Sequence, residues 1–246
     1  RWSHTATTLA DGRVLVTGGR TGSTSANGIV LNTAEVYDPA TNAWTETAGP
    51  MSVARRSHTA TLLPGGKVLI AGGGSGVATA SSQPIQSAEL FDPTTGLFTL
   101  IGNMVERRSA HSAILLDDGT VLISAGSNGA GTLYPTNTAE IFNPANNSFT
   151  AVGPMNYPHL AQLPGKLRDG RVVQGSSYYN LTHTAAGGRI TDESEIYDPA
   201  TQSFTPIAPM FKQRIDIGAQ GLLDGTLLIA GGVTTSPNFP SIFQST

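Results

Sequence analysis

One phrase returns four times along the chain at nearly constant spacing. It reads AEVYDP at Ala34–Pro39, AELFDP at Ala88–Pro93, AEIFNP at Ala139–Pro144 and SEIYDP at Ser194–Pro199. The glutamates of these phrases, Glu35, Glu89, Glu140 and Glu195, lie 54, 51 and 55 residues apart. A period of this length is typical of solenoids and propellers, in which each unit buries its apolar surface against its neighbours. The chain is therefore predicted to fold as a series of like units.

Each unit also contains a two-residue turn between two short apolar runs. The turns are Asp11-Gly12, Gly65-Gly66, Asp118-Gly119, Asp169-Gly170 and Asp224-Gly225. Asp-Gly and Gly-Gly accept positive φ, so these segments predict tight β-hairpins. The repeated phrase predicts a third strand that ends at its proline, and the aromatic residue that follows (Trp44, Phe98, Phe149 or Phe204) marks a fourth. No segment has a sustained 3.6-residue apolar period, so no substantial helix is expected.

The double glycine after the second strand, the Tyr or Phe of the third strand and the Trp or Phe of the fourth together resemble the kelch motif. This resemblance covers nearly the whole chain and implies an all-β fold, a β-propeller of four-stranded blades with the first strand innermost. We expect five blades in a single domain, the last begun by Ile215–Gly232 and completed by Ser241–Ser245 as a degenerate third strand. The expected repeats are approximately 1–54, 55–107, 108–158, 159–213 and 214–246.

Ring closure is expected to be unusual. Kelch rings generally close by sharing one blade between the two termini, but Arg1 starts directly on a first strand. We therefore expect either a three-stranded last blade or further sequence in the native protein.

Composition excludes several classes of function. Charged residues are 13% of the chain and the formal net charge is −3, which gives no basis for binding nucleic acid or a membrane surface. No apolar stretch approaches 18 residues, so no membrane insertion is predicted. The absence of cysteine removes disulfides, thiolate metal sites and the tyrosine–cysteine cofactor of the copper radical oxidases that share the kelch fold, and we predict no cofactor. A surface rich in Thr, Ser, Asn and Gly favours an extracellular or cell-surface location.

Cations recur four residues after the methionine of each link between blades. They are Arg55, Arg108, His159 and Arg214, and a one-blade period places them around the mouth of the central channel. One interpretation is a ring that binds a carboxylate, a phosphate or an acidic peptide. The other, which we favour because a feature present in every blade usually serves the repeat, is that Arg55 and Arg108 pair with the repeated glutamates.

Three histidines, His4, His58 and His111, also follow the blade period. They could converge on a metal near the axis. However, the fourth and fifth units have Gln162 and Ile217 in place of the histidine, and no carboxylate lies near these histidines at a spacing typical of metal ligands. Structural hydrogen bonding is therefore favoured, and no metal site is predicted.

Residues that the repeat does not require are better candidates for a binding site. The segment Ser176–Glu193, interpreted as a loop, contains two adjacent tyrosines and a histidine where other units have small residues. Such tyrosines suit sugar stacking or protein contact, or alternatively pack on the outer edge of the blade. The predicted ligand-binding residues are Arg56, Arg107, His159, Tyr178, Tyr179, His183 and Arg214.

Three functions fit these features. The leading hypothesis is a non-catalytic binding module of a secreted or surface protein, recognising an acidic or carbohydrate ligand or a protein partner at the channel mouth. The second is a carbohydrate-active enzyme resembling the kelch sialic-acid epimerase, with His159, His183 or Asp216 moving protons. The third is a structural repeat element whose blades assemble with neighbouring chains.

Overall fold

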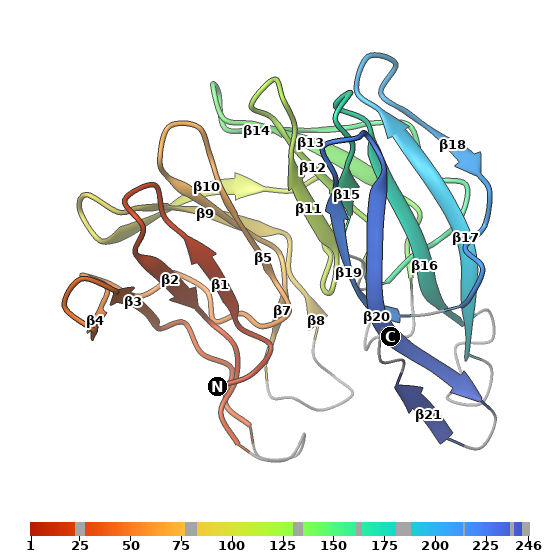
Figure 1. Ribbon diagram of the computed structural model, residues 1–246. Coiled ribbons are helices and arrows are strands. Elements are labelled where there is room, and N and C mark those ends of the chain that lie inside the picture. Colours follow the sequence, from red (N-terminus) through yellow and green to blue (C-terminus); the bar gives the residue numbers. More distant parts are fainter. Residues whose placement is uncertain are drawn as a thin grey trace.

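The computed structural model describes residues 1–22, 28–76, 83–129, 135–160, 164–180, 188–213, 215–236 and 239–242. Within them it contains strands and turns but no helix, and so no helix long and apolar enough to cross a membrane. Five antiparallel sheets follow one another along the chain, four of four strands and a last one of three, which confirms the predicted all-β propeller of five blades with an incomplete fifth (Figure 1).

The strands of the first two blades are β1 Thr5–Thr8, β2 Val14–Thr17, β3 Ala34–Asp38 and β4 Ala43–Glu46, then β5 Thr59–Leu62, β6 Val68–Ala71, β9 Ser87–Asp92 and β10 Leu97–Asn103. A small ribbon, β7 Gly74–Ser75 with β8 Gln83–Pro84, extends the second blade. The third blade has β11 Ser112–Leu115, β12 Val121–Ser124, β13 Ala139–Asn143 and β14 Ser148–Ala151. The last two have β15 Gly165–Lys166, β16 Val172–Asn180, β17 Gly188–Asp198 and β18 Ser203–Ile207, then β19 Ile215–Gly221, β20 Leu227–Ser236 and β21 Phe239–Ile242.

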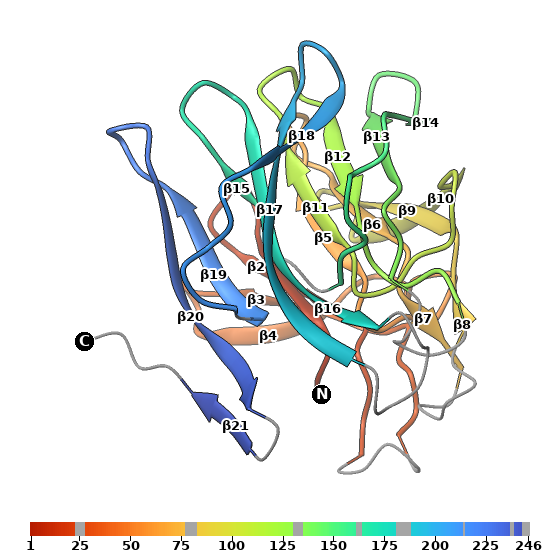
Figure 2. The ribbon, with the colours of Figure 1, turned by 90° about the vertical axis from the view of Figure 1, so that its right-hand side faces the viewer.

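The first strand of each blade lies innermost, as predicted. β5 contacts both β1 and β11, and β15 contacts β19, so neighbouring blades meet along their first strands. The fourth strands face outward; every residue of β4 is exposed. Figure 2 shows the blades turning about a common axis, with the hairpin turns at one end and the links between blades at the other.

Apolar side chains fill the spaces between blades. One cluster joins Leu15 and Ala34 of the first blade to Val68 and Phe91 of the second. Equivalent clusters, each including the methionine of the intervening link (Met51, Met104 or Met155), lie between the second and third and between the third and fourth blades. The fold is thus held by blade-to-blade burial, as expected for a repeat in which single units have no core of their own.

One prediction about the chain after residue 175 is wrong. Most of the described part of Ser176–Glu193 is not a loop, because β16 and β17 continue as a long hairpin that pairs Tyr178 with Ile190. Aromatic and β-branched residues favour the extended backbone there. The predicted third strand of the fifth blade is present as β21, but it begins at Phe239 rather than Ser241, and residues 243–245 lie outside the described part of the chain. It pairs Ile242 with Val233, beyond the stretch of β20 that other blades use for this contact.

Candidate functional site

The links between blades and the loops after each second strand emerge at the same end of the propeller, the lower end in Figure 1. At this end, backbone hydrogen bonds connect the links to one another. The Ser57 amide donates to the Ser3 carbonyl at 2.9 Å, and the Ala110 amide donates to the Ser57 carbonyl at 2.9 Å. All three residues have positive φ, 54°, 51° and 49°, a conformation that non-glycine residues rarely adopt. The channel mouth therefore has a backbone that its own hydrogen bonds hold in place.

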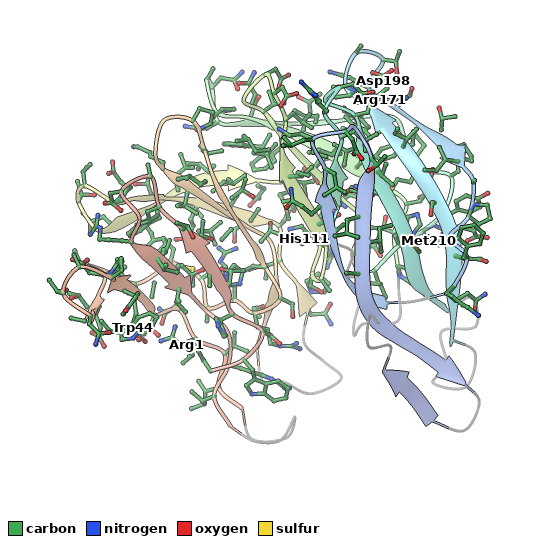
Figure 3. The ribbon with its side chains drawn as sticks, viewed as in Figure 1. Arg1, Trp44, His111, Arg171, Asp198 and Met210 are labelled. Carbon is green, nitrogen blue, oxygen red and sulfur yellow. The ribbon has the colours of Figure 1, made fainter. Side chains whose placement is uncertain are left out.

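The repeated glutamates pair with the arginines of the links, which confirms the structural interpretation. Arg55 Nη2 lies 2.7 Å from Glu89 Oε1, and Arg108 Nη2 lies 2.8 Å from Glu140 Oε1. These four side chains are at most 1% exposed. In the first blade Arg1 bonds Glu35 in the same way, but the Glu35 side chain is 35% exposed. Figure 3 shows Arg1 at the mouth end of its blade, whereas the turn residues Arg171 and Asp198 lie at the opposite end of the fourth.

His159 takes the arginine position in the fourth blade. Its ring is fully buried, and Nε2 lies 3.1 Å from Glu195 Oε1. Burial alone would raise the pKa of Glu195, but hydrogen bonds from His159, from Asn156 and from the Tyr157 amide lower it below its ordinary value. His159 thus occupies a structural position beneath the mouth surface; its predicted contact with a ligand is untested.

Two of the three periodic histidines, His58 and His111, make hydrogen bonds between blades, whereas His4 is exposed. His58 Nε2 lies 2.8 Å from Thr17 Oγ1 and 3.0 Å from Thr5 Oγ1, both in the preceding blade. Burial, with a smaller effect of Arg55, lowers the pKa of His58 to about 3, so the ring is neutral at pH 7. His111 bonds Thr59 Oγ1 at 2.9 Å, and burial holds its pKa well below the ordinary value. Among the described residues, no three His, Asp or Glu side chains gather in a way that could hold a metal.

Two arginines near the mouth lack the carboxylate that the periodic cations have. Arg20, which follows β2, places its guanidinium 3.5 Å from the ring centroid of Trp2 and is 8% exposed. Arg56 is half-buried; burial, and then the positive charge of Arg20, lower its pKa. The Nε atoms of both arginines are buried without a hydrogen-bond partner, and neither guanidinium forms an ion pair with another described residue. Two neighbouring cations and an indole therefore form a cluster, Trp2–Arg20–Arg56, with uncompensated positive charge.

Arg107 lies on a different part of the same face. Its exposed side chain lines a pocket of about 370 Å³ together with Gln86, Val105, Glu106 and Asn128. The Glu106 carboxylate is held by the Thr138 hydroxyl at 2.9 Å. This pocket presents a cation, a carboxylate and two amides, which suits a polar ligand of mixed charge.

The remaining predicted residues are placed only in part. Tyr178 and Tyr179 lie on the extension of β16 beyond the blade, paired with Ile190 and Arg189, and their side chains are outside the described part of the structure. His183 and Arg214 lie outside the described residues altogether. Of the seven predicted residues, Arg56 therefore joins a cluster at the mouth, and Arg107 lines a separate pocket.

Comparison with known proteins identifies the repeat. The family model of the kelch motif matches residues 1–51 and again residues 55–105. Residues 1–105 thus contain two kelch repeats. It is similar to Kelch-like protein 23 of Homo sapiens, with 27% identity over 226 residues that cover 91% of this chain and 36% of that protein. The same protein of Mus musculus is 26% identical over the same shares, so the kelch chain spans about a third of the length of these relatives.

Solved structures support the kelch fold. YjhT superimposes with a TM-score of 0.75 and 14% identity, covering 98% of this chain and 84% of its own. A fungal alcohol oxidase of the AA5 family, solved in complex with copper, has a TM-score of 0.55 and 18% identity, covering 94% of this chain and 58% of its own. At these identities the likeness shows the fold and says nothing of activity.

Sequence reasoning missed Arg20 and Trp2 of the mouth cluster. A signal was available, because Arg20 directly follows the double glycine of the first kelch repeat, where the second and third repeats have Gly74 and Ser127. Trp2 likewise stands where those repeats have Arg56 and Ser109, as the matching β-bridges show. Both are departures from the repeat, the criterion that had selected Arg56. What the sequence alone did not reveal is that Arg20 of one blade lies near enough to Arg56 of the next for its charge to lower the pKa of Arg56.

Proposed function

We propose that this kelch propeller is a binding module that takes an acidic segment of a partner protein at its channel mouth, through Arg20 and Arg56. A carboxylate or phosphate would accept hydrogen bonds from the two buried guanidinium Nε atoms and offset the effects that lower the pKa of Arg56, which are burial first and then the positive charge of Arg20. Trp2 offers an apolar surface beside them. Kelch repeats commonly mediate protein binding, which supports a protein partner over a free small anion.

The observation that carries the proposal is the missing carboxylate. Arg55 and Arg108 each have a buried glutamate, so they are neutralised within the scaffold. Holding Arg20 and Arg56 together and largely out of water costs free energy that no carboxylate in the described structure offsets. Such a cost is typical of sites kept for a ligand rather than for stability.

The test uses Trp2 as its reporter. In a Trp44→Phe background Trp2 is the sole tryptophan, and titration with a hexaglutamate peptide should change its fluorescence, while a hexalysine peptide should not. Arg56→Gln should weaken binding of hexaglutamate roughly tenfold, the loss of one charge-assisted contact. Arg13→Gln is the matched control, because Arg13 pairs with Asp11 at a hairpin turn, the end of the blade away from the mouth.

The same titration separates the competing hypotheses. Equal affinity of the wild type, Arg56→Gln and Arg13→Gln for hexaglutamate would refute the proposed site. Binding of sialic acid or glucuronate in preference to the peptide would favour the carbohydrate ligand, and turnover of either sugar would favour the enzyme. An extracellular location is a further proposal, which rests on composition alone.

A further inference from the structure

A cavity of about 390 Å³ lies between the third and fourth blades, among the hairpin turns at the end of the propeller away from the mouth. Figure 2 shows the turns that follow β13 and β17 together at this upper end. Its apolar wall comes from Leu116, Ile141 and Val152 of the third blade and Pro199 of the fourth. The volume falls in the range of small-molecule pockets, about 300–1,000 Å³.

A buried tyrosine lines this cavity. Tyr197 is 1% exposed, and its ring packs on Phe204 with centroids 4.9 Å apart. Burial, with smaller effects of the Asp118 and Asp198 carboxylates, raises the pKa of Tyr197 to about 12, so the hydroxyl keeps its proton at pH 7. Within the described part of the chain no group forms a hydrogen bond with it. A buried hydroxyl without a partner has a free-energy cost that a ligand in the cavity can offset.

The other blades do not leave a free hydroxyl at this position. Phe91 and Phe142 occupy it in the second and third blades, so the core needs only the ring. Tyr37 occupies it in the first blade, where its hydroxyl donates to Asn42 Oδ1 at 3.0 Å. The fourth blade has Gln202 in place of that asparagine. Neither packing nor the turn therefore accounts for the hydroxyl in the fourth blade.

The third blade also leaves room that the first blade fills. The equivalent groove between the first and second blades measures about 210 Å³. There Arg13 Nη2 donates to the Pro93 carbonyl of the second blade at 3.4 Å, so its side chain crosses the groove. Thr120 takes this position in the third blade, and its short side chain bonds Asp118 Oδ1 at 2.7 Å instead.

The polar groups around the cavity suit a neutral sugar. The exposed Asp118 carboxylate accepts bonds only from its own turn among the described residues, and Asn143 and Asn146 present side-chain amides. A sugar hydroxyl both donates and accepts, so one hydroxyl can bridge Asp118 and Tyr197. An anion is disfavoured, because the described lining contains a carboxylate and no cation. An entirely apolar ligand would leave the polar groups unpaired.

We propose that the cavity between the third and fourth blades binds one neutral hexose ring, with Tyr197 donating to the sugar and Asp118 accepting from it. The apolar wall contacts the C–H face of the ring. This site lies at the opposite end of the propeller from the Trp2–Arg20–Arg56 cluster, and neither proposal depends on the other.

The test is a set of titrations followed by the amide NMR signals of the protein, in an Arg56→Gln background that removes the binding proposed at the mouth. The probes are glucose, galactose, mannose and N-acetylglucosamine, at least one of which should bind, and glucuronate, which should bind more weakly than glucose. Tyr197→Phe keeps the ring that other blades use and should weaken binding of the best sugar roughly tenfold. Tyr37→Phe removes the equivalent hydroxyl of the first blade and is the matched control, with unchanged affinity.

Two further variants test the cavity itself. Thr120→Arg introduces the arginine that the first and fourth blades have after this turn, Arg13 and Arg171, so the fold should tolerate it while sugar binding is lost. Asp118→Asn keeps an acceptor for the bonds of the turn but removes the charge, so the preference for glucose over glucuronate should shrink.

Three outcomes would overturn the proposal. Failure of all four neutral sugars to bind the folded protein would refute a hexose site. Equal affinity of the best sugar for the parent protein, Tyr197→Phe and Thr120→Arg would show that the sugar binds elsewhere. Tighter binding of ethanolamine than of any sugar, lost in Asp118→Asn, would assign the cavity to an amine.

Discussion

Replacement of Glu89 by alanine tests whether the repeated ion pair stabilises the propeller. The carboxylate accepts three hydrogen bonds, a buried one from Arg55 Nη2 and two partly buried ones from the Ser52 and Val53 amides. Without it, Arg55 keeps its bonds to the Gly72 carbonyl and to Ser87, but its charge stays buried without a counter-ion. Removal of one partner of a buried pair costs about 3–5 kcal/mol. For a chain of this size the melting temperature should fall by roughly 6–20 °C.

Glu35→Ala is the matched control for this prediction. Glu35 occupies the same position of the repeat and pairs with an arginine, but its carboxylate is partly exposed and accepts no backbone amide from the described residues. Exposed pairs contribute about 0–1 kcal/mol, so this variant should melt within roughly 4 °C of the wild type. Thermal unfolding followed by circular dichroism measures both. Equal melting temperatures for the two variants would refute the argument that burial sets the strength of the pair, and would return Arg55 to the list of ligand-binding candidates.

Two further predictions concern His58 and the tyrosines. Since burial lowers the pKa of His58 to about 3, the unfolded chain, with a histidine pKa near 6.5, binds more protons between these values. The free energy of unfolding should therefore be highest above pH 6.5 and fall as the pH drops toward 3, with this residue contributing up to about 1.4 kcal/mol per pH unit. In urea titrations across that range, the free energy of unfolding of His58→Gln should fall less steeply with pH than that of the wild type. Equal pH dependence of the two proteins would contradict the assignment. Alanine at both Tyr178 and Tyr179 should abolish ligand binding with little change in melting temperature if the pair contacts ligand, whereas loss of folding would assign it to packing.

The parts of the fold that could be predicted from the sequence are those that every blade shares. Four glutamates at one period indicated a position that each unit needs, and Arg55 and Arg108 recur in phase with it, so the pairs followed without any knowledge of distance. The hairpins followed from the Asp-Gly and Gly-Gly turns, whose backbone requirement is local. In a repeat protein the spacing of residues along the chain predicts some of their contacts, because a residue repeated in every unit contacts the same neighbours each time.

The parts that could not be predicted depend on contacts made once. The repeat is weak at the end of the chain, so the likeness of Ser241–Ser245 to the third strand did not predict that β21 pairs with Val233–Ser236 of β20. Strand pairing shifts easily when no buried face enforces it. The proximity of Arg20 to Arg56 depends on how far the first blade is turned against the second, a quantity that no single repeat encodes.

The contrast between the two sets of arginines bears on how a repeat protein acquires a site. Arg55 and Arg108 could not be released for a ligand without leaving Glu89 or Glu140 buried and unpaired, so the scaffold retains them. Arg20 stands where the next two blades have Gly74 and Ser127, and Arg56 stands where its neighbouring blades have Trp2 and Ser109, so the fold does not require a charge at either position. A charge that the fold does not require, and that no described carboxylate neutralises, is better explained by a ligand than by stability. For this reason the search for the partner should begin at the junction of the first two blades rather than at the periodic ring.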